Sequence, residues 1–127
     1  MSYYLTTKVN GTLDETFEKV SEALKTEGFG IVTDFDVSKA FKNKLGIDFR
    51  PYRILGACNP PFAKRTLELD DKIGVMLPCN VIIQQNEDGI EVTAIDPVAA
   101  MGAVDNAEMT EIAKEIHEKL KNVIDSL

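Results

Sequence analysis

A helical repeat of apolar residues at the C-terminal end is the feature that most limits how this chain can fold. From position 109 to position 127, apolar residues recur at steps of three, one, three, four, three, one and three. This spacing aligns them along one side of an α-helix. The residues are Met109, Ile112, Ala113, Ile116, Leu120, Val123, Ile124 and Leu127. Such a helix must cover another apolar surface, and we expect that surface to be a β-sheet.

The segments that would build this sheet are short and rich in β-branched and aromatic residues. A hairpin is predicted where the turn sequence Glu87-Asp88-Gly89 separates two of them. Pro78 interrupts another, because proline cannot donate a hydrogen bond to a neighbouring strand. The predicted strands are Tyr3–Val9, Phe29–Phe35, Tyr52–Ala57, Ile73–Leu77 with its continuation Val81–Gln85, and Ile90–Ile95.

Helix start and stop signals lie between these strands. Thr12 and Glu15 fit a capping box, in which side chains satisfy the free backbone N–H groups of a new helix, and Gly28 can end that helix. A second helix is predicted from a Ser38 cap to Gly46, and a third from Pro61 through Leu69. No structure is predicted for Val98–Val104.

The length and composition indicate a single globular domain. The chain has 127 residues, of which 44% are hydrophobic and 28% are charged, and it contains no internal repeat or linker. We therefore predict one α+β domain spanning residues 1–127. Its sheet should be antiparallel or mixed, with about five strands and with helices packed on one face.

The charge balance excludes some partners. Fourteen Lys and Arg residues stand against twenty-one Asp and Glu residues, which gives a net charge of −7. An acidic surface repels phosphate backbones, so we expect no nucleic-acid binding. No apolar run approaches the length of a membrane helix, so we expect no membrane association and a cytoplasmic location.

Two cysteines have similar surroundings and are the main candidates for chemistry. Cys58-Asn59 precedes Pro60 after one predicted strand, and Cys79-Asn80 follows Pro78. If the two strands are neighbours in the sheet, the thiols lie close together. Cys58 also sits just before a predicted helix, whose positive N-terminal end favours a thiolate over a thiol.

Several roles for these thiols stay open. They could form a reversible disulfide if their Cα atoms come within about 7 Å of each other. With a thioether from Met76 or Met101 they would suit a soft ion such as Cu(I), and with His117 they would suit zinc. A plainer interpretation is that both are small buried hydrophobes, and the spacing alone favours it because there is no C-x-x-C motif.

The other chemistry-bearing residues give weaker signals. His117, the single histidine, lies at the edge of the apolar side of the C-terminal helix, which is more typical of a helix-surface residue than of a general base. The acidic residues of turns and helix surfaces do not predict paired-carboxylate catalysis. The sequence contains no G-x-G-x-x-G, P-loop or G-x-S-x-G motif.

A family resemblance rests on three segments. They are Tyr52-Arg53-Ile54-Leu55-Gly56-Ala57-Cys58-Asn59-Pro60, which is followed by Ala63 and Leu67, then Leu77-Pro78-Cys79-Asn80-Val81, and finally Asp96-Pro97. In these segments, and from the first strand to the C-terminal helix, the chain resembles the bacterial and archaeal "domain of unknown function" family numbered 302. The resemblance implies a compact α+β domain in which these family-typical residues gather around one region. It implies no reaction. Cys, Asn and Asp together at strand ends nevertheless make a functional site as good an interpretation as packing alone.

These observations lead to three hypotheses. The first is a small binding domain, expected to be a homodimer, that holds a small ligand or a soft metal. Its pocket would be lined by Tyr52, Cys58, Asn59, Cys79, Asn80 and Asp96, with Cys58 and Cys79 as the candidate metal ligands. The second is a thiol-dependent redox or transfer enzyme, with Cys58 as the thiolate and Cys79 as the resolving partner. The third is a structural or protein-interaction domain.

Overall fold

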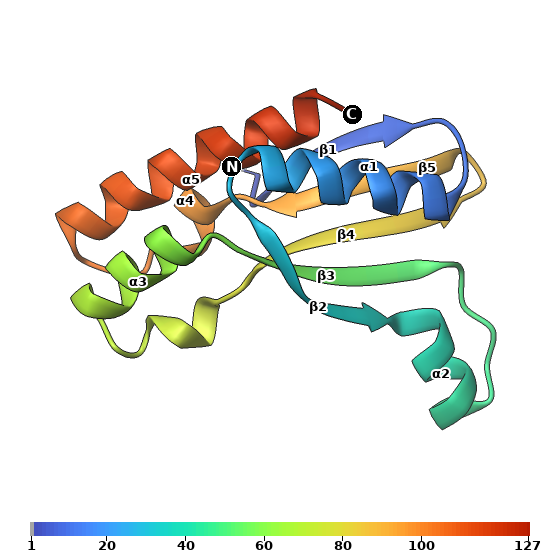
Figure 1. Cartoon of the computed structure of the whole chain (residues 1–127). Helices are drawn as coiled ribbons and strands as arrows, with labels where there is room; N and C mark the ends of the chain where they lie inside the picture. Colours follow the sequence, from blue (N-terminus) through green and yellow to red (C-terminus); the bar gives the residue numbers. More distant parts are fainter. Residues whose placement is uncertain (1) are drawn as a thin grey trace.

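Five antiparallel strands form a single sheet in the spatial order β1-β5-β4-β3-β2, and helices pack on one of its faces (Figure 1). The structure is a computed structural model and describes residues 2–127. The strands are β1 (Tyr4–Val9), β2 (Gly30–Asp36), β3 (Tyr52–Cys58), β4 (Cys79–Asn86) and β5 (Gly89–Ile95). The helices are α1 (Leu13–Thr26), α2 (Val37–Leu45), α3 (Pro60–Leu69), the 3-10 helix η1 (Ile73–Met76), α4 (Pro97–Ala100) and α5 (Ala107–Asp125). The predicted fold class is confirmed.

The β4–β5 hairpin forms the centre of the sheet, and its turn lies where the sequence predicts it. Asn86 pairs with Gly89 at the end of the hairpin. Gly89 has a φ of 120°, a conformation that only glycine adopts without strain. Tyr4 pairs with Ile95 on one side of the hairpin, which makes β1 an edge strand, while β3 pairs with β4 and places β2 at the other edge.

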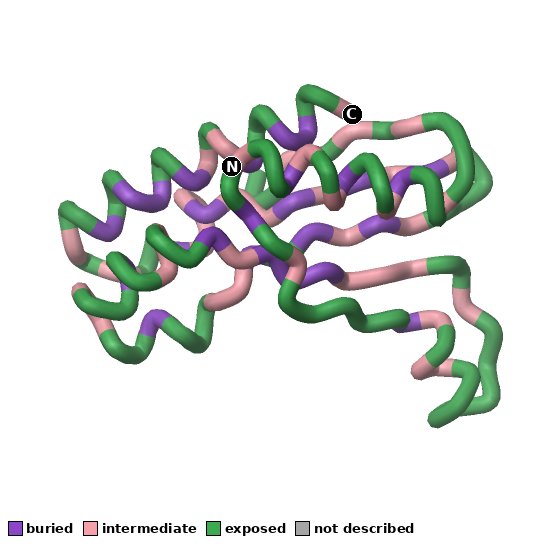
Figure 2. Tube along the Cα trace, in the orientation of Figure 1, coloured by how far each residue is buried: buried purple, intermediate pink, exposed green. Residues whose placement is uncertain are grey.

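The face of the sheet that α1 and α5 cover is here called the inner face. Alternate residues of β3, β4 and β5 belong to the core on this face. Buried positions also recur along α5, on the apolar side that the sequence predicts (Figure 2). The buried core contains Val20, Leu24, Leu55, Ala57, Val81, Ile83, Val92, Ala94, Ile112, Ile116, Leu120 and Val123. Among residues 2–127, no helix covers the centre of the opposite face, here called the outer face (Figure 1). Within residues 2–127, no helix is long and apolar enough to cross a membrane.

The helix ends follow the sequence signals with two differences, of which the smaller is that α3 begins at Pro60 and not at Pro61. The Glu15 N–H donates to Thr12 Oγ1 at 3.1 Å, as expected for the cap of α1. In α2, however, Asp36 and not Ser38 is the N-cap, and its carboxylate accepts the Lys39 N–H at 3.0 Å. The prediction of Ser38 is wrong because β2 runs without a loop into α2, so the helix begins two residues earlier.

The segment before Pro78 also differs from the prediction. Ile73–Leu77 was expected to be a strand, but Ile73–Met76 forms η1. Asp70 starts this turn, since its carboxylate accepts the Lys72 N–H at 2.9 Å and its backbone carbonyl accepts the Ile73 N–H at 3.1 Å. The apolar composition of the segment therefore reflects the burial of Ile73 beside Met101 and Met109, and not strand pairing.

Gly56 in β3 allows the close approach of two neighbours. A Cβ atom at this position would overlap the Thr33 hydroxyl and the Pro78 ring. Because position 56 carries no side chain, β2 and the start of β4 can pack tightly against β3. This approach positions Cys79 at the end of β3, next to the residues that lead into α3.

The first testable prediction concerns the apolar side of α5. Ile116→Ala should lower the free energy of unfolding by about 2 to 5 kcal/mol, because it removes a buried side chain from the core. The exposed Glu111→Ala on the same helix is the control and should change it little. Urea denaturation measures both, and equal small losses would contradict the assigned orientation of the helix.

A second prediction concerns Gly56. Gly56→Ala should destabilise the fold by about 1 to 3 kcal/mol, because the added methyl group must displace the Thr33 side chain or the Pro78 ring. Gly30→Ala, in β2, is the matched control, since a Cβ at position 30 meets no atom within 4 Å. Thermal unfolding of the two variants compares them, and a stable Gly56→Ala protein would show that the approach of Pro78 is not required.

Candidate functional site

Both cysteines line one apolar cavity, here called the thiol pocket, between α3 and the end of the sheet. Its volume is about 290 Å³. The walls come from β2, β3, α3, the η1–β4 connection and α5. The lining residues are Phe29, Val32, Ala57, Cys58, Asn59, Phe62, Ala63, Thr66, Leu67, Leu77, Pro78, Cys79 and Ile116. The structure therefore brings together three of the six residues that the sequence assigns to a site, namely Cys58, Asn59 and Cys79.

Cys58 is the last residue of β3 and is half-buried. It stands directly before Asn59, the N-cap of α3. The first two residues of α3 are Pro60 and Pro61, which carry no backbone N–H. The free N–H groups of a helix N-terminus are what hold an anion there, so this helix provides fewer of them than a usual N-terminus. The reason for expecting a thiolate at Cys58 is correspondingly weaker.

Cys79 is the first residue of β4 and is buried in the core. Its Cα partner on β3 is Ala57 and not Cys58, so the two cysteines are neighbours in the sheet but not directly opposite. Burial, and to a smaller extent the nearby Cys58, raise the pKa of the Cys79 thiol from 9.0 to about 11. Cys79 is therefore a neutral thiol at pH 7, and in this state it acts as part of the apolar wall.

Asn59 and Thr66 are the buried polar residues of the pocket, and both are engaged within the protein. The Asn59 side-chain amide donates to the Glu27 carbonyl at 3.2 Å, which ties the start of α3 to the end of α1. The Thr66 hydroxyl donates to the Ala63 carbonyl at 2.8 Å within α3. Asn59 thus has a structural contact that the sequence did not reveal.

Sequence reasoning missed several wall residues, above all Phe62, Thr66 and Leu67 of α3. Their spacing follows one side of a helix, so they could have been recognised as a surface that faces the sheet. What the sequence could not provide is the shape of that contact. Phe29, Val32 and Leu77 reach the same cavity from two other segments.

Tyr52 and Asn80 lie elsewhere, in a hollow on the outer face of the sheet. They alternate along β3 and β4 with the buried Leu55, Ala57, Val81 and Ile83, so their side chains point away from the core. The hollow has a volume of about 410 Å³ and is also lined by Tyr3, Tyr4, Thr6, Ile82, Gln84, Glu91, Thr93, Ala94 and Ile95. Tyr52 and Asn80 are thus outside the thiol pocket.

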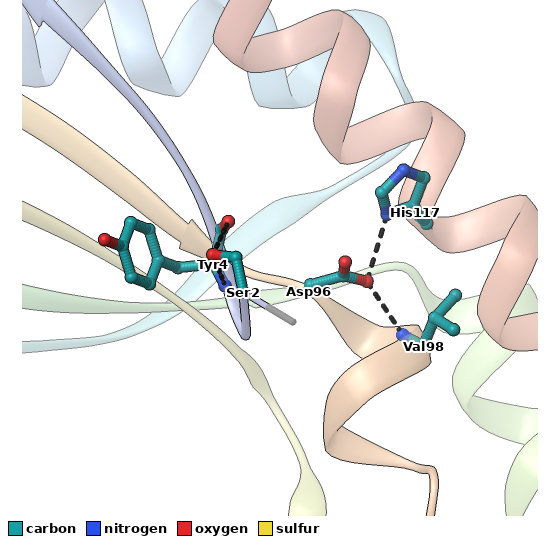
Figure 3. A network of polar contacts seen from close by, with 5 residues as sticks. All are labelled: Ser2, Tyr4, Asp96, Val98 and His117. Carbon is teal, nitrogen blue, oxygen red and sulfur yellow. Dashed lines mark hydrogen bonds and ion pairs between the residues drawn. The ribbon is translucent and has the colours of Figure 1, made fainter.

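Asp96 is engaged at a third place, between β5 and α5 (Figure 3). One carboxylate oxygen accepts the Val98 N–H at 2.9 Å and lies 3.0 Å from His117 Nδ1. Asp96 therefore caps α4 and connects it to the C-terminal helix, which explains its position directly before Pro97. His117 is half-buried beside it and does not line the thiol pocket.

The possible metal ligands are also distributed over more than one place. Among residues 2–127, no group of three or more His, Cys, Asp and Glu side chains is positioned to hold a metal ion. Met76 and Met101 line a further hollow of about 240 Å³, and Cys79 borders this hollow as well as the thiol pocket. The zinc set that included His117 is therefore not assembled, whereas Cys79 does have thioether groups near it.

Comparisons with known proteins agree on the family. A family model described as "Domain of unknown function DUF302" matches residues 5–127. The crystal structure of an uncharacterized conserved protein DUF302 from Bacillus stearothermophilus superimposes with a TM-score of 0.92 at 32% sequence identity, covering 98% of each chain. The comparison with curated proteins found no match. The chain belongs to the family of domains of unknown function DUF302.

Proposed function

We propose that this protein is a binding domain for a small, largely apolar molecule, which it holds in the thiol pocket. The observation that carries the proposal is the chemistry of the lining. The walls are formed mainly by apolar side chains, and the Asn59 side-chain N–H and the Thr66 hydroxyl already donate to backbone carbonyls inside the protein. A ligand with many polar groups would lose its hydration and gain little in return, whereas an apolar one gains from burial.

The volume of the thiol pocket limits the size of the ligand that it can hold. Its volume of about 290 Å³ is roughly twice that of a cavity of about 150 Å³ that binds benzene. It lies at the lower end of the range for ligand pockets in proteins. The ligand that fits best is therefore a compact molecule with one or two rings or a branched aliphatic chain.

The two thiols differ in what they offer such a ligand. Cys79 stays protonated at pH 7 because burial raises its pKa. Cys58 is half-buried at the start of α3 and is the more accessible sulfur. We assign to Cys58 a polarizable contact with the ligand at the edge of the apolar surface.

A soft metal is the alternative occupant, and one observation favours it. Cys79 borders both the thiol pocket and the hollow lined by Met76 and Met101, so thiol and thioether sulfurs occur in one region. Binding would require loss of the Cys79 proton, whose pKa is raised to about 11. This cost favours the apolar ligand over the metal.

A thiol-dependent enzyme is the less favoured alternative. A nucleophilic cysteine needs stabilisation of its thiolate, but Pro60 and Pro61 remove two of the backbone donors that the start of α3 would provide. Cys79, as the resolving partner, would also have to lose its proton in an apolar environment. The missing backbone donors at the start of α3 and the apolar environment of Cys79 both disfavour a thiolate. They therefore suit a binding site better than a thiol-dependent enzyme.

The binding proposal predicts that benzene, used as a probe, enters the thiol pocket. In methyl NMR spectra, benzene should shift the signals of Leu67, Leu77 and Ile116 in a saturable way. Ala63→Phe should abolish these shifts, because the new ring fills the cavity from α3. Lys64→Phe is the matched control, since it adds the same ring to an exposed neighbour outside the pocket, and it should leave binding unchanged.

Other results would contradict this proposal. Shifts that persist in Ala63→Phe would place the benzene elsewhere in the protein. Elemental analysis and native mass spectrometry of gently purified protein test the metal alternative. One equivalent of copper or zinc, retained by the wild type and lost in Cys58→Ala, would favour a metal site over an apolar ligand.

A further prediction follows from the burial of Cys79. In the unfolded chain this thiol ionises near pH 9, but in the folded protein only near pH 11. Its contribution to the free energy of unfolding is therefore fully present below pH 9 and is lost as the pH rises to 11. The loss should be about 2 to 3 kcal/mol.

The control for this experiment is Cys79→Val, which has a similar size and no ionisable group. Denaturation of both proteins at a series of pH values separates this effect from the titration of lysines and tyrosines. The difference in stability between wild type and variant should shift steadily in favour of the variant above pH 9. A difference that does not change with pH would show that Cys79 is less buried than described here.

A further inference from the structure

Two neighbouring surfaces have no covering element in the part of the chain that the structure describes, and both lie outside the thiol pocket. One is the outer face of the sheet. The other is residues 37–51, comprising α2 and the loop that follows it, here called the arm. In α2 the one buried residue is Val37. The arm extends beyond the sheet at the end of β2, and most of it is exposed (Figures 1 and 2).

The arm is fixed against one end of the outer face. The rings of Phe41 and Phe49 are 5.0 Å apart, and those of Phe49 and Tyr52 are 6.1 Å apart, so the stack leads from α2 to β3. Arg50 Nε donates to Gln84 Oε1 of β4 at 2.9 Å. These contacts hold the arm in place but leave its apolar tip in solvent, with Leu45 64% and Ile47 47% exposed.

The outer face beside the arm has the composition of an interface. Among the described residues that line its hollow, Glu91 is the one charged residue, and the others are tyrosines, aliphatic residues and neutral polar residues. In a chain with 28% charged residues this is a depletion of charge. Low charge together with enrichment in tyrosine is typical of the centre of a protein–protein interface.

We propose that the arm and the outer face form the interface with a second copy of this chain, related by a two-fold axis, with each arm lying on the outer face of the other copy. Charge complementarity indicates this partner. The arm contains Lys39, Lys42, Lys44 and Arg50 against one acidic residue, Asp48. Among the described residues that line the hollow of the outer face, the one charged residue is the acidic Glu91. The basic arm of one copy is thus attracted to the outer face of the other.

An interface of the usual size needs both the outer face and the arm. Five strands about 4.8 Å apart, each roughly 23 Å long, give an outer face of roughly 550 Å² per copy. A stable interface commonly buries about 800 Å² per partner. A flat face of this size falls short of that value, and the exposed side chains of Leu45 and Ile47 on the arm add apolar area to the contact. In a two-fold arrangement the same contact forms twice, which closes the dimer.

Sedimentation equilibrium over a concentration series tests the proposal. The wild type should have twice the monomer mass of 14.0 kDa. Ile47→Asp on the arm and Tyr4→Asp on the outer face should each raise the dissociation constant at least about 30-fold, the effect of losing an interface hot spot. Val75→Asp is the matched control, because Val75 is apolar and 87% exposed but lies on η1, and it should not change the dissociation constant.

Circular dichroism establishes that each variant is folded, and Leu45→Asp replaces Ile47→Asp if the latter does not fold. A monomeric wild type, or a dimer that Val75→Asp dissociates but Ile47→Asp does not, would overturn the proposal. Mixing Ile47→Asp with Tyr4→Asp tests the exchange of arms. The mixed dimer keeps one unaltered arm on one unaltered face, so partial recovery of dimers is expected, and no recovery would overturn the exchange.

Discussion

The burial of the inner face by α1 and α5 is the interaction on which the rest of this structure depends. The two helices cover β1, β5 and β4 and fill the core with aliphatic side chains. The shorter α3 is left to cover the end of the sheet where β3 stops. Its fit there is less complete, and the space that remains is the thiol pocket. The cavity therefore exists because α1, α3 and α5 differ in length and together cover one face of the sheet.

The sequence predicts this arrangement well where a regular spacing of apolar residues extends over a long segment. The apolar repeat of α5 and the turn before Gly89 both identify their elements, because each signal is set by local backbone geometry. The prediction fails at Ile73–Leu77, where four apolar residues fit a strand or a buried helical turn equally well. Which of these forms is decided by contacts with Met101 and Met109, which lie far along the chain.

The candidate site was harder to predict because neighbouring residues on a strand point to opposite sides. The two Cys-Asn pairs look alike as sequence, but Cys79 faces the core whereas Asn80 faces the outer hollow. The alternation of β4 already contains this information, since Cys79, Val81 and Ile83 share one parity. Asn59 does not follow that rule because it is the N-cap of α3 and not part of a strand. The carboxylate of Asp96 contacts the first turn of α4 and His117, so it does not face a pocket with the cysteines.

Binding in the thiol pocket and association through the outer face would use different parts of the same two strands. In β3, Tyr52 contacts the arm, whereas Ala57 and Cys58 line the pocket. Gly56 lies between these parts and is held between Thr33 and Pro78 with no room for a side chain. A tightly packed segment of this kind transmits a shift of Pro78 directly to β3. Pro78 also lines the thiol pocket, so its approach to Gly56 is a direct contact between the pocket wall and β3.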